Sequence, residues 1–132
     1  MRISCFLLFL TSLLLVACNQ GSETAESPDF TGTYNLVSVD GHAVPYAPTH
    51  QGQLAPEIVS SSLSLKDDGT FSMVMSYTNP SGGTISRDFT GTYTSQGSDF
   101  NLNWEGAGQT KVTIEGDTLT LNNEGMLFVY QK

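Results

Sequence analysis

The chain has 132 residues, of which 39% are hydrophobic, and its formal net charge at pH 7 is −8. This length is sufficient for one domain with a single hydrophobic core. Because thirteen acidic residues stand against five basic ones, the surface repels phosphate backbones and anionic lipid head groups. The composition therefore excludes nucleic-acid binding and electrostatic docking to an anionic membrane.

The first eighteen residues, MRISCFLLFLTSLLLVAC, have the pattern of a secretory signal peptide. Arg2 precedes an apolar run from Phe6 to Ala17, and a run of about 12 residues is too short to span a bilayer core, which needs about 20. The closing residues, LVAC, resemble the lipobox of bacterial lipoproteins. This resemblance implies that residues 1–17 are removed and that Cys18 becomes an N-terminus carrying acyl chains such as palmitate. The alternative is an ordinary signal peptide with a chance cysteine.

Residues 18–29 have the composition of a flexible tether, because they contain no aromatic or β-branched apolar side chain that a core needs. Cleavage removes Cys5 and Arg2, which leaves four basic against thirteen acidic residues and a net charge of −9. Cys18 is then the only cysteine, so we expect no internal disulfide. Asn19, in place of aspartate, resembles the outer-membrane sorting signal of enteric bacteria, so we expect a lipid-anchored protein of the bacterial cell envelope, in the outer membrane.

Residues 30–132 are predicted to form one all-β domain, because apolar and polar residues alternate and no segment keeps a helical period for ten residues. After TGTYNLVSV (31–39), the predicted inward-facing sets are Val59, Ser61, Leu63 and Leu65; Phe71, Met73, Met75 and Tyr77; Ile85, Arg87, Phe89, Gly91 and Tyr93; Phe100, Leu102 and Trp104; Val112 and Ile114; Leu119 and Leu121; and Met126, Phe128 and Tyr130. They indicate an antiparallel eight-stranded meander barrel.

Two turns support these faces, because opposite residues in a hairpin point to the same side of the sheet. Leu65 lies opposite Phe71 if residues 67–69 form a three-residue loop with Gly69 in the left-handed region. Ile114 lies opposite Leu119 if residues 116–117 form a two-residue type II′ turn. Both loops agree with faces assigned independently.

The hexapeptide DFTGTY occurs twice, at residues 29–34 and 88–93. The flanking sequences do not match, which argues against an internal duplication. A glycine inside a strand marks a bend or a close backbone approach. We therefore predict that Gly32 and Gly91 are bending positions with outward-facing threonines.

The spaced segments FTGTYNLVSVDGHAVP, LSLKDDGTFSM, FTGTYT, VTIEGDTLTL and GMLFVYQK resemble the small lipocalin-like domains of bacterial lipoproteins. The resemblance covers residues 30–132 and implies a lipocalin-like barrel. True lipocalins have tryptophan where Tyr34 follows Gly32, and they continue into a helix that we do not expect here. A second resemblance is to the small β domain of heat-shock-associated lipoproteins, whose Gly-Cys-Asn signature is missing.

Candidate functional residues are few, and no motif of a catalytic site occurs. Residues 40–57 contain both His42 and His50 and are predicted to form a lid over the barrel mouth, with Tyr46 as a plug. The two histidines are weak metal candidates, and solvated histidines are the alternative. Arg87 either anchors an anionic group inside the barrel or lies at the rim.

The predicted ligand-binding side chains are Tyr46, Met73, Met75, Tyr77, Arg87, Tyr93 and Trp104. Large inward residues favour a filled interior, whereas methionines suit an adaptable apolar pocket. We predict a lipid-anchored binding protein for a small apolar or amphipathic ligand, without a cofactor or catalytic activity. The alternative is a structural, interaction or inhibitor-type lipoprotein with a filled core; no protein partner is indicated.

Overall fold

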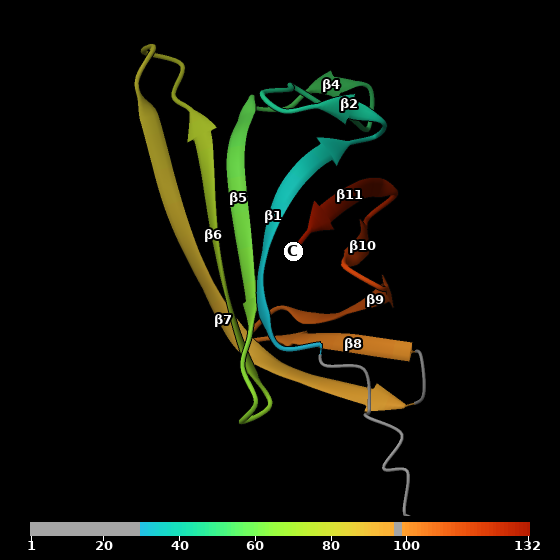
Figure 1. Cartoon of the computed structure of the whole chain (residues 1–132). Coiled ribbons are helices and arrows are strands. Elements are labelled where there is room, and N and C mark those ends of the chain that lie inside the picture. Colours follow the sequence, from blue (N-terminus) through green and yellow to red (C-terminus); the bar gives the residue numbers. More distant parts are fainter. Residues whose placement is uncertain (1–29, 97–98) are drawn as a thin grey trace, which may run out of the picture.

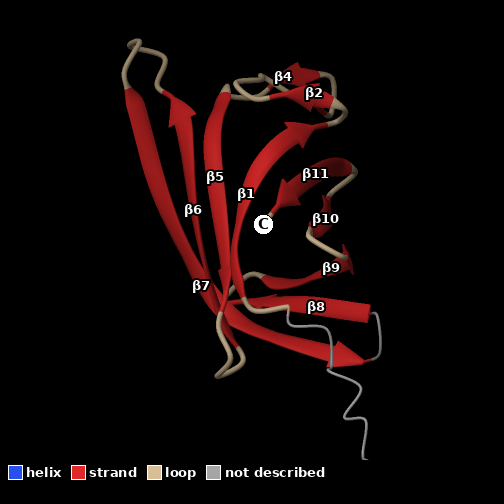
Figure 2. Cartoon of the chain, viewed as in Figure 1, coloured by secondary structure: helices blue, strands red, loops and turns tan. Residues whose placement is uncertain are grey.

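The computed structural model describes residues 30–96 and 99–132, and all regular secondary structure in these residues is β (Figure 2). The predicted signal peptide (1–17) and tether (18–29), with Cys18, lie outside the described residues. The strands are β1 (Gly32–Val39), β2 (His42–Ala43), β3 (Thr49–His50), β4 (Gln53–Leu54), β5 (Ile58–Leu65), β6 (Thr70–Thr78), β7 (Thr84–Gln96), β8 (Asp99–Trp104), β9 (Gly108–Glu115), β10 (Thr118–Asn123) and β11 (Met126–Gln131).

Eight strands form a closed antiparallel barrel, and Figure 1 shows how they curve around its interior. Each of the strands from β5 to β10 pairs with the next, β1 pairs with β5, and β11 closes the barrel by pairing with β1. The closing register places Leu36 opposite Tyr130 and Val39 opposite Phe128. The predicted eight-stranded meander is therefore confirmed. Strand β2 pairs with the end of β1, and β3 with β4 forms a separate small sheet.

Both predicted turns are confirmed. Leu65 pairs with Phe71 across a turn in which Gly69 has φ of 83°, and Lys66 N–H donates to the Thr70 carbonyl over 2.9 Å. Ile114 pairs with Leu119, and Gly116 has φ of 58°, as the first central residue of a type II′ turn requires. These two hairpins fix the register that turns their apolar residues inward.

The core lies inside the barrel and draws on every one of its strands except β7, whose Phe89 and Tyr93 pack against it half-buried. Its buried hydrophobic members are Tyr34, Leu36, Val39, Ile58, Leu63, Leu65, Phe71, Met73, Met75, Phe100, Leu102, Val112, Ile114, Leu119, Leu121, Phe128 and Tyr130. The barrel strands and all of these core residues lie within residues 32–131. Over the described ranges, no helix is long and apolar enough to cross a membrane.

Two departures from regular alternation shape the barrel. A bulge between Ile58 and Ser60 brings Ile58 into the core, where it is 3% exposed, while the predicted Val59 is half-buried. Strand β7 has 13 residues but β8 has only 6, and their pairing begins at Gly91. Residues 84–90 therefore pair with β6 alone within the described chain. This leaves the barrel wall open beside the first half of β7.

The prediction that Ile85 and Arg87 lie inside the barrel is wrong, because neither side chain is buried. Their cross-strand partners, Tyr77 and Met75, confirm the predicted face. Both residues are nevertheless exposed, because none of the described strands pairs with the other side of β7 before Gly91.

Candidate functional site: an apolar cavity at the open end of the barrel

A cavity of about 500 Å³ occupies one end of the barrel interior, called here the open end. It is lined by residues from the start of β5, the end of β6, the first half of β7, the ends of β8 and β10 and the start of β11. Sites for small ligands have roughly this size, 300 to 1,000 Å³. The sequence favoured an interior filled throughout by side chains, and the structure does not have one. Side chains fill only the opposite end.

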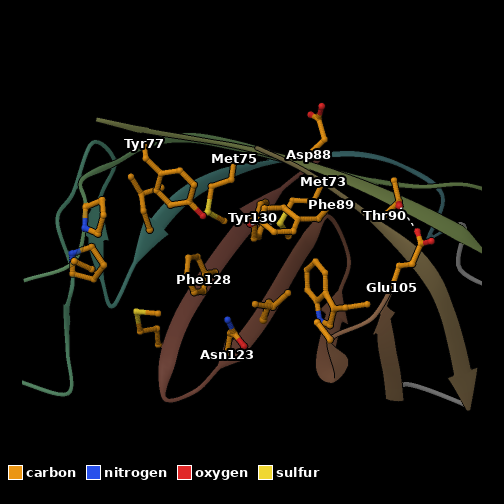
Figure 3. Close-up of a pocket in the computed structure, with 18 residues that line it drawn as sticks. Met73, Met75, Tyr77, Asp88, Phe89, Thr90, Glu105, Asn123, Phe128 and Tyr130 are labelled. Carbon is orange, nitrogen blue, oxygen red and sulfur yellow. Dashed lines mark hydrogen bonds between the residues drawn. The ribbon is translucent and has the colours of Figure 1, made fainter. Parts of the chain in front are cut away.

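The cavity wall is rich in methionine and aromatic side chains. Met73, Met75, Phe89 and Phe128 converge on it from three strands, as Figure 3 shows. Methionine side chains are flexible and polarisable, so they adapt to ligands of irregular shape. The wall is therefore suited to an apolar body without a rigid outline.

Trp104 forms another part of the wall and is held firmly. Its indole N–H donates to the Thr110 hydroxyl over 2.7 Å, which satisfies the donor inside the protein. Its ring meets Phe71 edge-on at 5.0 Å and Phe89 edge-on at 6.1 Å between centroids. Because its donor is satisfied, Trp104 offers the cavity an apolar, aromatic surface.

A buried hydroxyl pair lies beneath this wall. The hydroxyl oxygens of Tyr130 and Ser61 are 3.1 Å apart, and the Tyr130 hydroxyl also approaches the Met73 sulfur at 4.0 Å. Burial raises the pKa of Tyr130 to about 12, although the Ser61 hydrogen bond acts in the opposite direction. Tyr130 is therefore a neutral hydrogen-bonding group at every physiological pH.

Tyr77 lies at the lid side of the cavity, half-buried. Burial raises the pKa of its phenol above the ordinary value, and the positive charge of Arg87 opposes that shift. Arg87 itself is exposed and does not belong to the cavity lining. Tyr77 thus contributes a neutral hydroxyl.

The opening beside β7 is bordered by a polar contact between Thr90 of β7 and Glu105, the residue that follows β8. The Thr90 hydroxyl donates to Glu105 Oε2 over 3.0 Å, and Glu105 N–H donates to the Thr90 carbonyl over 3.1 Å. Figure 3 shows Glu105 turned toward Thr90, and Asp88 directed away from the cavity on the outer side of β7. The border therefore carries the Glu105 carboxylate, whereas the Asp88 carboxylate lies on the outer face of β7.

Residues 40–57, the lid segment, cross the open end in the form of β2, β3 and β4 with connecting turns. Pro48 is buried, and together with Ala55 and Pro56 it lines the cavity. Tyr46 forms a β-bridge with Ile58 and stacks on His42 at 4.3 Å between ring centroids. Tyr46, the predicted plug, packs half-buried against the core, but Pro48, Ala55 and Pro56 line the cavity on this side and Tyr46 does not.

Two contacts fasten the lid segment to the β10–β11 hairpin. His50 Nε2 lies 3.3 Å from Glu124 Oε2. Asp40 N–H donates to the Leu127 carbonyl over 2.8 Å, and Asp40 Oδ1 accepts from Leu127 N–H over 2.8 Å. In the part of the chain that the structure describes, no three His, Cys, Asp or Glu side chains gather closely enough to hold a metal ion.

The structure brings together only part of the predicted site. Met73, Met75, Tyr77 and Trp104 do line the cavity. Tyr93 instead lies at the filled end, where its hydroxyl donates to the Lys66 carbonyl. Arg87 and Tyr46 also lie outside the lining.

Sequence reasoning did not single out Pro48, Glu105, Leu121, Asn123 or Met126, which also line the cavity. The missing signal was position along each strand rather than residue type. In an antiparallel meander, the start of one strand lies beside the end of the next. Chain position therefore predicts which inward residues share one end of the barrel.

Comparison with protein families settles the classification. Residues 30–121 match the model of the lipocalin-like domain. The chain belongs to this lipocalin-like family. Its closed eight-stranded barrel agrees with that assignment, and the fold is of a ligand-binding type.

Two solved structures are similar to this lipocalin-like chain. A lipocalin-like protein from Bacteroides uniformis is 18% identical, with a TM-score of 0.47, over 77% of this chain and 96% of that one. An uncharacterized protein from Bacteroides eggerthii is 16% identical, with a TM-score of 0.46, over 79% of this chain and 99% of that one. No curated protein sequence matches the chain.

Proposed function

We propose that this lipocalin-like domain is a non-catalytic binding protein that holds a small apolar or amphipathic molecule in the cavity at the open end of the barrel. The observation that carries the proposal is the cavity of about 500 Å³ walled by methionine and aromatic side chains. Burying apolar ligand surface against such a wall contributes about 25 cal/mol per Å². A cavity of this kind argues against the alternative of a lipoprotein with a filled core.

The test uses residues 19–132, which contain the complete barrel, purified without detergent. Native mass spectrometry is expected to detect a co-purified small molecule, and the neutral apolar probe N-phenyl-1-naphthylamine is expected to bind and displace it. Met126 lines the cavity half-buried, whereas the neighbouring Leu127 is 40% exposed. Met126→Trp should therefore abolish probe binding, and Leu127→Trp should leave it unchanged. A protein that is empty and binds no probe would refute the proposal.

We propose further that the barrel is anchored to the bacterial cell envelope, in the outer membrane, through acyl chains on Cys18. The support is the resemblance of LVAC to the lipobox, and two or three acyl chains are enough for stable anchoring. Cys18→Ser should leave an unprocessed precursor and abolish labelling by an alkyne fatty acid. Persistent labelling of that variant would contradict the anchor.

A further inference from the structure

The charges of the barrel are unevenly placed with respect to the cavity. Among the described residues that line it, two are acidic, Asp88 and Glu105, and none is lysine, arginine or histidine. Because Asp88 is directed outward (Figure 3), a ligand in this cavity meets the Glu105 carboxylate at its border, and no lysine, arginine or histidine lines the wall.

The residues around the cavity also carry more negative than positive charge. The acidic residues at the open end are Asp40, Glu57, Asp88, Glu105 and Glu124, since each either lines the cavity or bonds to a strand end or lid residue beside it. The basic groups there are Arg87, close enough to Tyr77 to influence its ionisation, and two lid histidines: His50, which faces Glu124, and His42, which stacks on Tyr46. The open end therefore carries an excess of negative charge.

The lysines of the described chain lie away from the cavity. Lys66 follows β5 at the filled end, and Lys132 lies 5.8 Å from the centre of the Tyr34 ring, also at the filled end. Lys111 Nζ is 3.5 Å from Asp99 Oδ1 on the β8–β9 pair. None of them offsets the carboxylates beside the cavity.

The cavity wall provides a second source of attraction for a cation. Trp104 neighbours Glu105 in the chain, and Trp104, Phe89 and Tyr77 all present aromatic surface to the cavity. Aromatic faces attract alkylammonium groups, and tryptophan does so most strongly. The donors that could meet an anion are the uncharged Tyr77 hydroxyl and Asn123 amide in the wall, and Arg87, which lies near Tyr77 but outside the lining.

From this distribution we infer that the cavity selects amphipathic molecules with a cationic head group over those with an anionic head group. The inference rests on the proposed binding function and specifies the ligand class for that same site. The apolar body lies against Met73, Met75 and Phe128, and the ammonium group lies at the border near Trp104 and Glu105. Attraction between the open end and such ligands weakens with salt, because these carboxylates are exposed.

The experiment compares three twelve-carbon ligands with different head groups: protonated dodecylamine, dodecanol and dodecanoate. Trp104 is the only tryptophan of the chain and lies in the cavity wall, so its fluorescence reports binding directly. Residues 19–132 are titrated at neutral pH with each ligand below its micelle concentration, with circular dichroism to confirm that the barrel stays folded. Dodecylamine is expected to bind at least about threefold more tightly than dodecanoate, with a smaller ratio in roughly 0.5 M sodium chloride.

Matched variants locate the charge responsible. Glu105→Gln keeps an oxygen that can accept the Thr90 hydrogen bond but removes the charge, and it should reduce the preference for dodecylamine. Glu115→Gln makes the same change at an exposed position on β9 outside the cavity lining, and it should leave the preference unchanged.

Three outcomes separate the inference from the proposed function. Tighter binding of dodecylamine that depends on Glu105 supports both. Equal or tighter binding of dodecanoate overturns the inference on charge and leaves the binding function standing. No change of Trp104 fluorescence with any ligand, together with failure to bind the neutral probe, overturns both.

Discussion

A β-carbon placed on Gly91 would lie 2.0 Å from the carbonyl oxygen of Asn103 and 2.7 Å from the Phe71 ring. Gly91 is the residue at which β7 leaves the open wall and begins to pair with β8. The close backbone approach predicted for this copy of DFTGTY is therefore confirmed. At Gly32, the first copy, a β-carbon would meet the Lys132 side chain at 2.7 Å, where φ is +125°.

Gly91→Ala should destabilise the barrel by about 3 kcal/mol or more, because the Asn103 backbone must move to admit the methyl group. Urea unfolding followed by circular dichroism measures the change. Gly83→Ala is the control, since a β-carbon there meets nothing within 4 Å, and its effect should stay within about 0.5 kcal/mol. Equal stability of the two variants would contradict the close approach.

The stability of the barrel should fall as the pH rises from about 10 to about 12. Burial raises the pKa of Tyr130 from 10.0 to about 12 in the folded state. Between these values the unfolded chain releases the phenolic proton while the folded chain retains it, so rising pH favours unfolding. Two pKa units correspond to about 2 to 3 kcal/mol of folding stability, which is present below pH 10 and is lost as the pH rises toward about 12. Tyr130→Phe should show a shallower decline in chemical unfolding experiments over the same pH range.

Asp40 combines a left-handed backbone, with φ of 49°, and a side-chain hydrogen bond to Leu127 N–H. Asp40→Asn should hardly change the stability, because asparagine adopts the left-handed backbone and keeps an oxygen that can accept the hydrogen bond. Asp40→Gly loses the hydrogen bond but fits the backbone, and Asp40→Ala loses the bond and adds strain. We expect costs in the order Asn, Gly, Ala, with about 1 to 2 kcal/mol for alanine. Thermal unfolding gives the ranking, and a harmless alanine would contradict it.

Arg87→Gln should change the free energy of unfolding by no more than about 0.5 kcal/mol, since Arg87 is exposed. Removing one partner from a buried ion pair would cost about 3 to 5 kcal/mol. Equilibrium urea unfolding separates these cases. A loss of the larger size would mean that Arg87 is paired inside the barrel.

The sequence was sufficient to predict the fold because local signals agreed. The three-residue turn before Thr70 and the two-residue turn after Glu115 each fix a register, and both registers match the alternation of the strands they join. Strand order follows, since successive strands of a meander are neighbours. Closure of the barrel depends on pairs such as Leu36 with Tyr130, whose wide separation in the chain leaves no local signal.

The site was only partly predictable because alternation gives the face of a residue but not its depth in the barrel. Met75 and Arg87 share one face and are directly paired. Met75 is buried, whereas Arg87 is exposed, since the wall beside it ends with β8. The length of β8 relative to β7, which decides this, is not encoded in the residues of β7.

The unequal lengths of β7 and β8 also bear on how copies of this protein meet each other. The Thr90 carbonyl points toward β8, and the Tyr93 N–H points toward the β6 side. Because these directions alternate along a strand, the N–H and C=O groups of Ser86 and Asp88 point to the same side as those of Thr90, which is the unpaired edge. Such an edge invites another strand. If two copies pair along this edge about a two-fold axis, one residue must lie opposite the same residue of the other copy. A pair centred on Arg87 places two guanidinium groups opposite each other. A pair centred on Asp88 places two carboxylates opposite each other. Like charges directly opposite disfavour both of these registers, so the charges of this edge restrict the registers in which two copies can pair.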